Sequence, residues 1–222
     1  MPILLALDPG TSTGYCLVNI EVDKNGYYSS ADIYEYGFID VDISSDYQGD
    51  HCISLMERLQ TLIDTHGVEW ICVEDFFFSK RFVNGCNVNA AFRTAIHILA
   101  RQNGLDYTIL NISSWKTFVA GRSTTTKEQK LRWGKEPAKK LAIQEALWEW
   151  WGFRFPNHST SETTGKPILF RFDIVDVVGQ AVYYCGLICG VPSASITLSV
   201  EVPEDVVFTR QVKKRFIYPD GK

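Results

Sequence analysis

The sequence ILLALDPGTSTGYCLVNIEV, at residues 3–22, gives the clearest indication of the fold. An apolar run ends at Asp8, a Pro-Gly turn follows, and a second apolar run begins at Gly14. Two apolar runs on either side of such a turn predict strands at 3–8 and 14–22 that form a hairpin. A strand-end aspartate before a Pro-Gly turn is commonly a turn former, so its role is either structural or chemical at this point.

The rest of the chain alternates strands and helices. Further strands are predicted within 31–41 and at 69–75 and 106–112, and helices at about 50–65, 87–103, 137–151 and 173–190. Hairpin strands followed by such an alternation predict an α/β fold, a mixed sheet with helices on both faces. Residues 152–172 are polar and are predicted as a loop or a short hairpin. We expect one domain over 1–190 and a C-terminal extension over 191–222 that forms a β-hairpin.

The composition is that of a globular chain. The 222 residues, 45% hydrophobic and 22% charged, fit one domain with a substantial core. No apolar run reaches the roughly 18 residues of a membrane span, and the N-terminus lacks the features of a signal peptide. We therefore expect a cytoplasmic protein with no membrane partner. Six scattered cysteines without a CxxC pair predict buried, reduced thiols.

Charge is distributed unevenly along the chain. Residues 1–75 hold 14 acidic and 2 basic side chains, a net charge of −12, although the whole chain carries only −4. Residues 116–140 carry a net charge of +6. This basic segment is either a solvated helix surface or a phosphate-binding surface, because affinity for DNA comes mainly from local cation–phosphate contacts. Its basic residues are Lys116, Arg122, Lys127, Lys130, Arg132, Lys135, Lys139 and Lys140.

Acidic residues stand where a site would form. Asp8 ends the first predicted strand, and Glu74 and Asp75 end the fourth. Asp173 and Asp176 open the last helix at i, i+3 spacing, which places them on one face. Ligands of such sheets gather at the carboxyl ends of central strands. Each acid also has an ordinary reading as a turn former, a helix cap or a solvated side chain.

Convergence of these acids would require compensation of their charge. Carboxylates in close contact near a surface repel by about 4 kcal/mol per pair, so protons or divalent cations must be present. Oxygen-only ligation suits Mg²⁺ or Mn²⁺. Two such ions in one site are the apparatus for in-line hydrolysis of a phosphodiester.

Three segments resemble the RuvC family of Holliday-junction resolvases, within the ribonuclease H-like superfamily. They are LALDPGTSTGY at 5–15, VEDFFF at 73–78 and RFDIVDVVGQAVYY at 171–184. The resemblance covers about residues 1–190 and implies a ribonuclease H-like mixed five-stranded sheet. It implies that catalysis and the binding of two Mg²⁺ or Mn²⁺ ions rest on Asp8, Glu74, Asp173 and Asp176. Asp75 falls where the family has an uncharged residue, so we place it outside the site.

The resemblance extends to residues that would contact DNA. Lys116 and Lys127 lie eleven residues apart, the spacing of two functional lysines of the family, which implies catalytic roles at the phosphates. Phe77 matches an aromatic residue that would stack on an unpaired base, an interaction worth about 1–3 kcal/mol. Further nucleic-acid contacts are expected from Lys80, Arg81, Arg122, Lys130 and Arg132.

The resemblance implies a metal-dependent endodeoxyribonuclease that resolves four-way (Holliday) junctions by paired nicks. A homodimer is expected because a junction is nearly two-fold symmetric, with the helix at 87–103 as the interface. No Ser, Cys or Tyr with a base partner is apparent, so no covalent intermediate is expected. The longer segment at 152–172 and the tail after 191 resemble a bacteriophage or otherwise divergent member, whose location would be the bacterial host cell.

Four alternatives remain open from the sequence. A broader flap or fork nuclease, or a ribonuclease acting on RNA–DNA hybrids, would use similar acids. The DPGTSTG turn at 8–14 also resembles the phosphate hairpin of actin-like ATP-binding proteins, although the chain shows no second such hairpin. A non-catalytic junction binder is disfavoured because all four acids are present.

Overall fold

The fold centres on a six-stranded mixed sheet. The computed structural model describes residues 1–41, 47–75, 83–133, 135–155, 158–160, 167–169 and 173–200. The strand order is β5-β4-β1-β2-β3-β8, with β1 antiparallel to β2 and parallel to β4. The predicted α/β fold is confirmed. The strand bounds are β1 Ile3–Asp8, β2 Ser12–Val22, β3 Tyr28–Asp40, β4 Val68–Glu74, β5 Asp106–Leu110 and β8 Ile196–Leu198.

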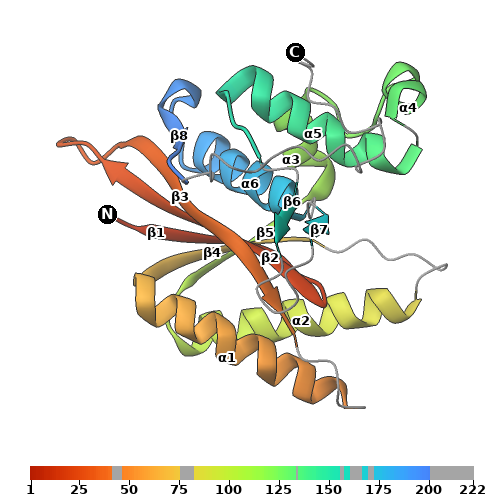
Figure 1. The fold of residues 1–222 in the computed structure, drawn as a ribbon. Coiled ribbons are helices and arrows are strands. Elements are labelled where there is room, and N and C mark those ends of the chain that lie inside the picture. Colours follow the sequence, from red (N-terminus) through yellow and green to blue (C-terminus); the bar gives the residue numbers. More distant parts are fainter. Residues whose placement is uncertain are drawn as a thin grey trace.

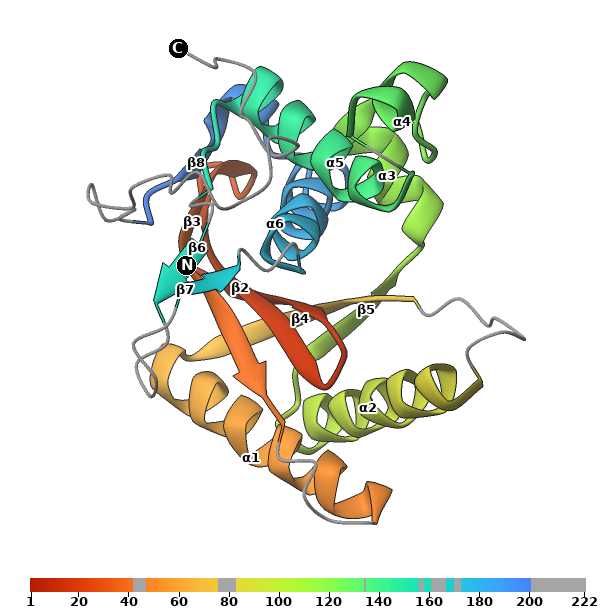
Figure 2. The same cartoon turned by 45° about the vertical axis from the view of Figure 1, so that its right-hand side comes forward.

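Helices cover both faces of this sheet (Figure 1). One face carries α1 (Gln48–His66) and α2 (Val83–Gln102), and the other carries α6 (Asp173–Tyr183). Outside α6 lie α3, α4 and α5, with bounds Ile112–Ala120, Lys127–Trp133 and Lys135–Trp151 (Figure 2). None of the helices in these described ranges is long and apolar enough to cross a membrane.

Alternating side chains of β1 pack into two separate hydrophobic cores, one on each face of the sheet. Leu5 and Leu7 pack with α1 and α2, whereas Leu4 and Ala6 pack with α6 on the other face. Because successive side chains of a strand point to opposite faces, this parity also decides where the polar residue at the strand end lies. Asp8 follows Leu7 and therefore belongs to the α6 face.

The last predicted helix, expected over 173–190, is shorter in the structure, and its polar face is buried as well as its apolar face. It ends at Tyr183 and continues as one π-helical turn, Tyr184–Ile188. Every residue from Ile174 to Val182 is buried, including the polar ones. The reason is that α3 and α5 pack on the helix from outside, so its polar side chains face protein rather than solvent.

Two short helices, α3 and α4, lie between β5 and residue 135, where no helix was predicted from the sequence. The Asn111 side chain accepts a hydrogen bond from the Ser114 amide at 3.1 Å and caps α3. Gly121 adopts a left-handed conformation at φ 68° and ends that helix. Thr126 and Gln129 exchange side-chain to backbone hydrogen bonds, a capping box that starts α4. Both helices are too short to show a clear apolar period.

The C-terminal segment adds a strand that the predicted five-stranded sheet lacks. β8 pairs in parallel with Ala31–Ile33 at the edge of the sheet, and Ile196 is buried there. The second strand of the expected C-terminal hairpin lies after residue 200, outside the described residues. Within 152–172, β6 (His158–Thr160) and β7 (Pro167–Leu169) pair antiparallel, which confirms the short-hairpin alternative.

Candidate active site

Asp8 and Glu74 end two adjacent parallel strands at the same edge of the sheet. Leu7 of β1 pairs with Val73 of β4, so the next residue in each strand is Asp8 and Glu74, respectively. Neighbouring strands lie about 4.8 Å apart. Both residues occupy the parity that faces α6, because the preceding Leu7 and Val73 belong to the core under α1 and α2. The two predicted strand-end acids are therefore neighbours on one face.

The turn after Asp8 is held by its own side chains. The Thr13 hydroxyl donates to the Gly10 carbonyl at 2.8 Å and accepts from the Gly10 amide at 3.2 Å, and Thr13 is fully buried. Ser12 donates to Asp40 at 2.8 Å and ties the turn to β3. This turn is therefore braced from both sides and fixes the backbone that carries Asp8.

Asp176 lies on α6, one helical turn before Gln180, whose side chain contacts Glu74. It is 2% exposed, although a carboxylate is among the groups least often buried. Burial of an isolated carboxylate is costly, so its charge needs hydrogen bonds or cations nearby. The fourth predicted acid, Asp173, is the first residue of α6, and its side chain lies outside the described part of the chain.

Glu74 is held by two neutral donors from different elements. The Trp115 indole Nε1 of α3 donates to Glu74 Oε2 at 2.9 Å. The Gln180 amide Nε2 of α6 donates to the same oxygen at 3.3 Å. Trp115 and Gln180 are both fully buried. The carboxylate is therefore anchored at one oxygen by a helix on each side of it.

Close packing between α3 and α6 places the indole. A Cβ added at Gly179 would lie 2.9 Å from Cζ3 of Trp115, so only glycine leaves room for the ring against the helix. Seven residues further on, a Cβ added at Gly186 would lie 2.9 Å from Cζ of Phe118, so this glycine leaves the same room for that ring. On the other side of the indole, Lys116 Nζ lies 4.9 Å from the ring centroid, within cation–π range. Trp115 thus connects the acidic edge with the basic segment.

Asp75 belongs to the opposite face of the sheet. Its carboxylate forms an ion pair with Arg93 of α2. The alternation of side chains along β4 requires this, since Glu74 already faces α6. This geometry agrees with the placement of Asp75 outside the expected site.

The donor set fits a hard divalent cation in its chemistry. Asp8, Glu74 and Asp176 supply carboxylate oxygens on one face of the sheet, which are the ligands that Mg²⁺ and Mn²⁺ prefer. Gln180 Oε1 is buried and has no hydrogen-bond partner among the described atoms, a local excess of acceptors. The side chains that the structure describes include no group of three His, Cys, Asp or Glu residues close enough to hold a metal ion. The carboxylate of Asp173 is not among those side chains.

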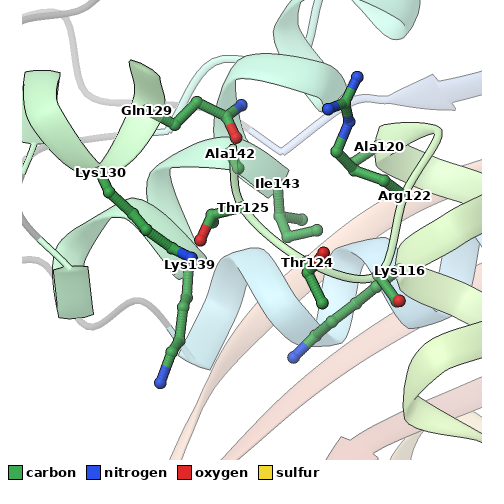
Figure 3. A pocket seen from close by; sticks show the side chains of 11 residues that line it. Lys116, Ala120, Arg122, Thr124, Thr125, Gln129, Lys130, Lys139, Ala142 and Ile143 are labelled. Carbon is green, nitrogen blue, oxygen red and sulfur yellow. The ribbon is translucent and has the colours of Figure 1, made fainter. Parts of the chain in front are cut away.

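A basic cavity of about 210 Å³ lies beside Lys116, between α3, α4 and α5 (Figure 3). The four cationic side chains that line it come from three helices and the loop after α3. Figure 3 shows Arg122 directed away from Lys116 and Lys139. Hydroxyl and amide groups supply further donors, so the lining suits a phosphate. Its polar lining residues are Lys116, Arg122, Ser123, Thr124, Thr125, Gln129, Lys130 and Lys139.

The remaining predicted DNA contacts are less closely grouped. Lys127 is exposed at the start of α4 and does not line the cavity. Arg132 pairs with Glu145 of α5 at 3.2 Å, which ties α4 to α5. Burial raises the pKa of Glu145, and the Arg132 cation partly offsets this shift. Phe77, Lys80 and Arg81 lie outside the described residues.

A second polar network lies on the far face of the sheet. The Tyr34 hydroxyl lies 3.2 Å from His66 Nδ1, and His66 Nε2 lies 3.6 Å from Glu35. The prediction that no tyrosine has a base partner was therefore wrong for Tyr34. Burial raises the pKa of Tyr34, which keeps it protonated and disfavours a role as nucleophile. The network joins β3 to α1.

The described cysteines are free thiols, as expected. Cys16, Cys72 and Cys185 are buried, whereas Cys52 and Cys189 are partly buried. Burial raises the pKa of Cys189 to about 11 and that of the buried three further above the usual range. The three buried thiols are therefore protonated core residues.

Two site residues were not predicted from the sequence: Trp115 and Gln180. Gln180 lies four residues after Asp176, so its place on the same helix face was visible, but a glutamine there has no distinctive signal. Trp115 directly precedes Lys116 in a segment whose helix was not predicted. The bond from Trp115 to Glu74 spans 41 residues of sequence and the bond from Gln180 spans 106, and no local pattern carries that information.

Comparison with known proteins places the chain in a family. The family model for crossover junction endodeoxyribonuclease RuvC matches residues 4–133. The RuvC protein of Dictyoglomus thermophilum is 28% identical over 128 residues, which are 57% of this chain and 76% of that protein. Thermus thermophilus RuvC in complex with Holliday junction substrate has a similar fold, with a TM-score of 0.53 and 13% identity over 81% of this chain and 90% of that one. A second structure of Thermus thermophilus RuvC gives a TM-score of 0.51 at 15% identity, over 82% of this chain and 95% of that one. The chain belongs to the RuvC family of crossover junction endodeoxyribonucleases.

Proposed function

We propose that this protein is a metal-dependent endonuclease that resolves four-way DNA junctions by paired phosphodiester nicks. The observation that carries the proposal is the acidic edge, where Asp8 and Glu74 are cross-strand neighbours and Asp176 is buried on α6, one helical turn before the Gln180 that contacts Glu74. This arrangement occurs in a chain of the RuvC family. The solved Thermus thermophilus RuvC that shares the fold is in complex with a Holliday junction.

The acids would hold two Mg²⁺ or Mn²⁺ ions through Asp8, Glu74, Asp173 and Asp176. The chemistry supplied by divalent cations at such carboxylates is activation of the attacking water and stabilisation of the leaving oxygen. The chain itself braces the Asp8 turn, anchors Glu74 from two helices and excludes water from around Asp176. Fixed donors and acceptors of this kind lower the reorganisation needed during the reaction.

Lys116 and Lys127 would bind the phosphates near the cleaved bond. Lys116 is half-buried against the Trp115 ring, which restricts its motion, whereas Lys127 is exposed and free to follow the DNA backbone. We expect Lys127→Ala to slow cleavage more than it weakens junction binding. A large loss of binding with unchanged turnover would make Lys127 a phosphate anchor only. Binding and single-turnover nicking of the same labelled junction separate the two.

The proposal extends to a homodimer with α2 at its interface. Ile98 on α2 and Ile109 on the edge strand β5 are each 48% exposed, so this helix and the neighbouring strand offer apolar side chains to a partner. Light scattering should give twice the 25.2 kDa chain mass for the wild type and a monomer for Ile98→Asp. A monomeric wild type that makes paired nicks would contradict this part of the proposal.

The decisive experiment is nicking of an immobile four-way junction in Mg²⁺, beside matched flap, fork and linear duplexes and an RNA–DNA hybrid. We expect symmetric paired nicks on the junction that disappear with chelator, with Asp8→Asn and with Glu74→Gln, while junction binding persists. Asp75→Asn is the matched control, because its carboxylate lies next in sequence but on the opposite face. Activity in Glu74→Gln, or loss of activity in Asp75→Asn, would overturn the site assignment.

The other substrates distinguish the alternatives. Equal cutting of flaps and forks would indicate a broader branched-DNA nuclease, and preferred cutting of the hybrid would indicate a ribonuclease. Binding of the junction without cutting, under conditions where Mg²⁺ is saturating, would indicate a non-catalytic junction binder.

A further inference from the structure

We propose that Trp115 and Gln180 are positioning residues that orient the Glu74 carboxylate toward the divalent cations of the site. This inference rests on the proposed function, because it assigns Glu74 a role in metal binding. It concerns residues outside the four acids and the two lysines. The one structural feature behind it is the pair of N–H donors that meet at Glu74 Oε2.

The two donors restrict the carboxylate in complementary directions. Trp115 reaches Glu74 from α3, and Gln180 reaches it from α6. A glutamate side chain has three rotatable bonds, and one hydrogen bond leaves it free to rotate about that contact. Two donors from different helices to one oxygen fix the position of that oxygen and the plane of the carboxylate. The direction of the other oxygen is then fixed as well. Outer hydrogen bonds of this kind orient metal ligands in many sites.

Packing alone does not account for Gln180. A carboxylate only accepts hydrogen bonds, so the amide nitrogen of Gln180 must face Glu74 and the amide oxygen must face away. That oxygen is buried without a hydrogen-bond partner among the described atoms. A buried amide with one unsatisfied end is unfavourable for stability compared with an apolar residue of the same shape. The geometry therefore assigns this side chain to the carboxylate that it contacts.

Phe118, on the same helix as Trp115, allows packing to be compared with hydrogen bonding. Trp115 and Phe118 both extend from α3 into gaps left by glycines, at Gly179 and Gly186. Phe118 lies beside two other aromatic rings, Trp151 at 6.5 Å and Tyr183 at 5.6 Å between centroids. Packing of α3 therefore needs an aromatic side chain at both places, but only the indole nitrogen of Trp115 reaches a carboxylate.

The first test uses three pairs of variants. Gln180→Met and Trp115→Phe remove the two donors and keep most of the side-chain volume. Gln144→Met and Trp151→Phe are their controls, because Gln144 is buried on α5 and the Trp151 indole nitrogen is buried without a partner among the described atoms. The third pair is Gly179→Ala, which displaces the indole, and Gly186→Ala, which displaces Phe118. Circular dichroism and unfolding curves establish that each variant is folded.

The expected result separates binding of the cation from binding of the DNA. Gln180→Met, Trp115→Phe and Gly179→Ala should each raise the Mg²⁺ concentration for half-maximal nicking by about 10- to 100-fold. Junction affinity measured in chelator should stay within about two-fold, because none of the three residues lines the basic cavity and Trp115→Phe keeps an aromatic ring beside Lys116. The three controls should match the wild type. Equal effects in test and control variants would mean a merely structural role and would overturn the proposal.

A spectroscopic readout tests the proposal without any cleavage. In protein labelled with ¹⁵N at tryptophan, the indole N–H signal that disappears in Trp115→Phe reports on the bond to Glu74. Titration with Mg²⁺ should shift this signal in the wild type, shift it only at higher Mg²⁺ in Gln180→Met, and leave it unmoved in Glu74→Gln. The Trp151 indole signal should not move in any of these proteins. An unmoved Trp115 signal in the wild type would overturn the proposal.

The two readouts distinguish failure of this inference from failure of the proposed function. A Mg²⁺-dependent indole shift in a protein that cuts no junction would support the positioning role and refute junction resolution. Junction cutting that depends on Mg²⁺, together with a Trp115 indole signal that does not shift with Mg²⁺, would support the function and refute the positioning role.

Discussion

The contact between Gly179 and Trp115 predicts a specific energetic coupling. In Gly179→Ala, the new Cβ would lie 2.9 Å from Cζ3 of a fully buried ring, which is too close for carbon atoms. Ile143 lies 3.5 Å from the same Cβ, so the helix has no open space on that side. The ring would have to retreat by about half an ångström, and such overpacking costs about 1–3 kcal/mol.

A second effect of the same substitution has the opposite sign. Alanine is favoured over glycine in a helix interior by about 1 kcal/mol. The net effect of Gly179→Ala in the wild type is therefore a destabilisation of at most about 2 kcal/mol. In the Trp115→Phe background the smaller ring leaves room, and the substitution should instead be neutral or stabilise by up to about 1 kcal/mol. Helix propensity cancels in the double-mutant cycle, which isolates a coupling of about 1–3 kcal/mol.

The assay is urea unfolding of the four proteins followed by far-ultraviolet circular dichroism, which does not depend on the tryptophan signal. If Gly179→Ala changes the free energy of unfolding equally in both backgrounds, within about 0.5 kcal/mol, there is no such coupling between the two positions. Gly186→Ala in the same two backgrounds is the control. Its partner is Phe118, so its effect should not depend on Trp115.

Three further predictions concern stability. Asn111→Ala removes the cap of α3 and should lower the free energy of unfolding by about 1 kcal/mol, whereas Asn111→Ser should retain most of it; equal losses in urea unfolding would contradict the cap. Burial raises the pKa of Tyr36 and Tyr107 to about 12, so stability should be intact below pH 10 and fall by up to about 1.4 kcal/mol per pH unit per tyrosine above it. Tyrosinate absorbance follows this ionisation, and normal titration near pH 10 would refute it. Arg93→Met removes the partner of Asp75 and should cost less than about 1 kcal/mol while junction nicking is unchanged, and a loss of nicking would implicate Asp75 in the site.

Much of the sheet is predictable from the sequence. Apolar runs that end at Asp8 and at Glu74 predict two strand ends, and β1 and β4 end at these residues. The i, i+3 spacing of Asp173 and Asp176 predicts a shared helix face. Strand ends and helix faces are predictable because each depends on the local period of the backbone, 2.0 for a strand and 3.6 for a helix.

Which side chains meet across those elements depends on tertiary packing. The order of strands beyond the hairpin, the parallel addition of β8 and the burial of Asp176 depend on which helix covers which face. The anchoring of Glu74 joins side chains from β4, α3 and α6, and it exists because Gly179 lets α3 approach α6 closely. Close packing of this kind depends on the shapes of side chains far apart in sequence, and no local period records it.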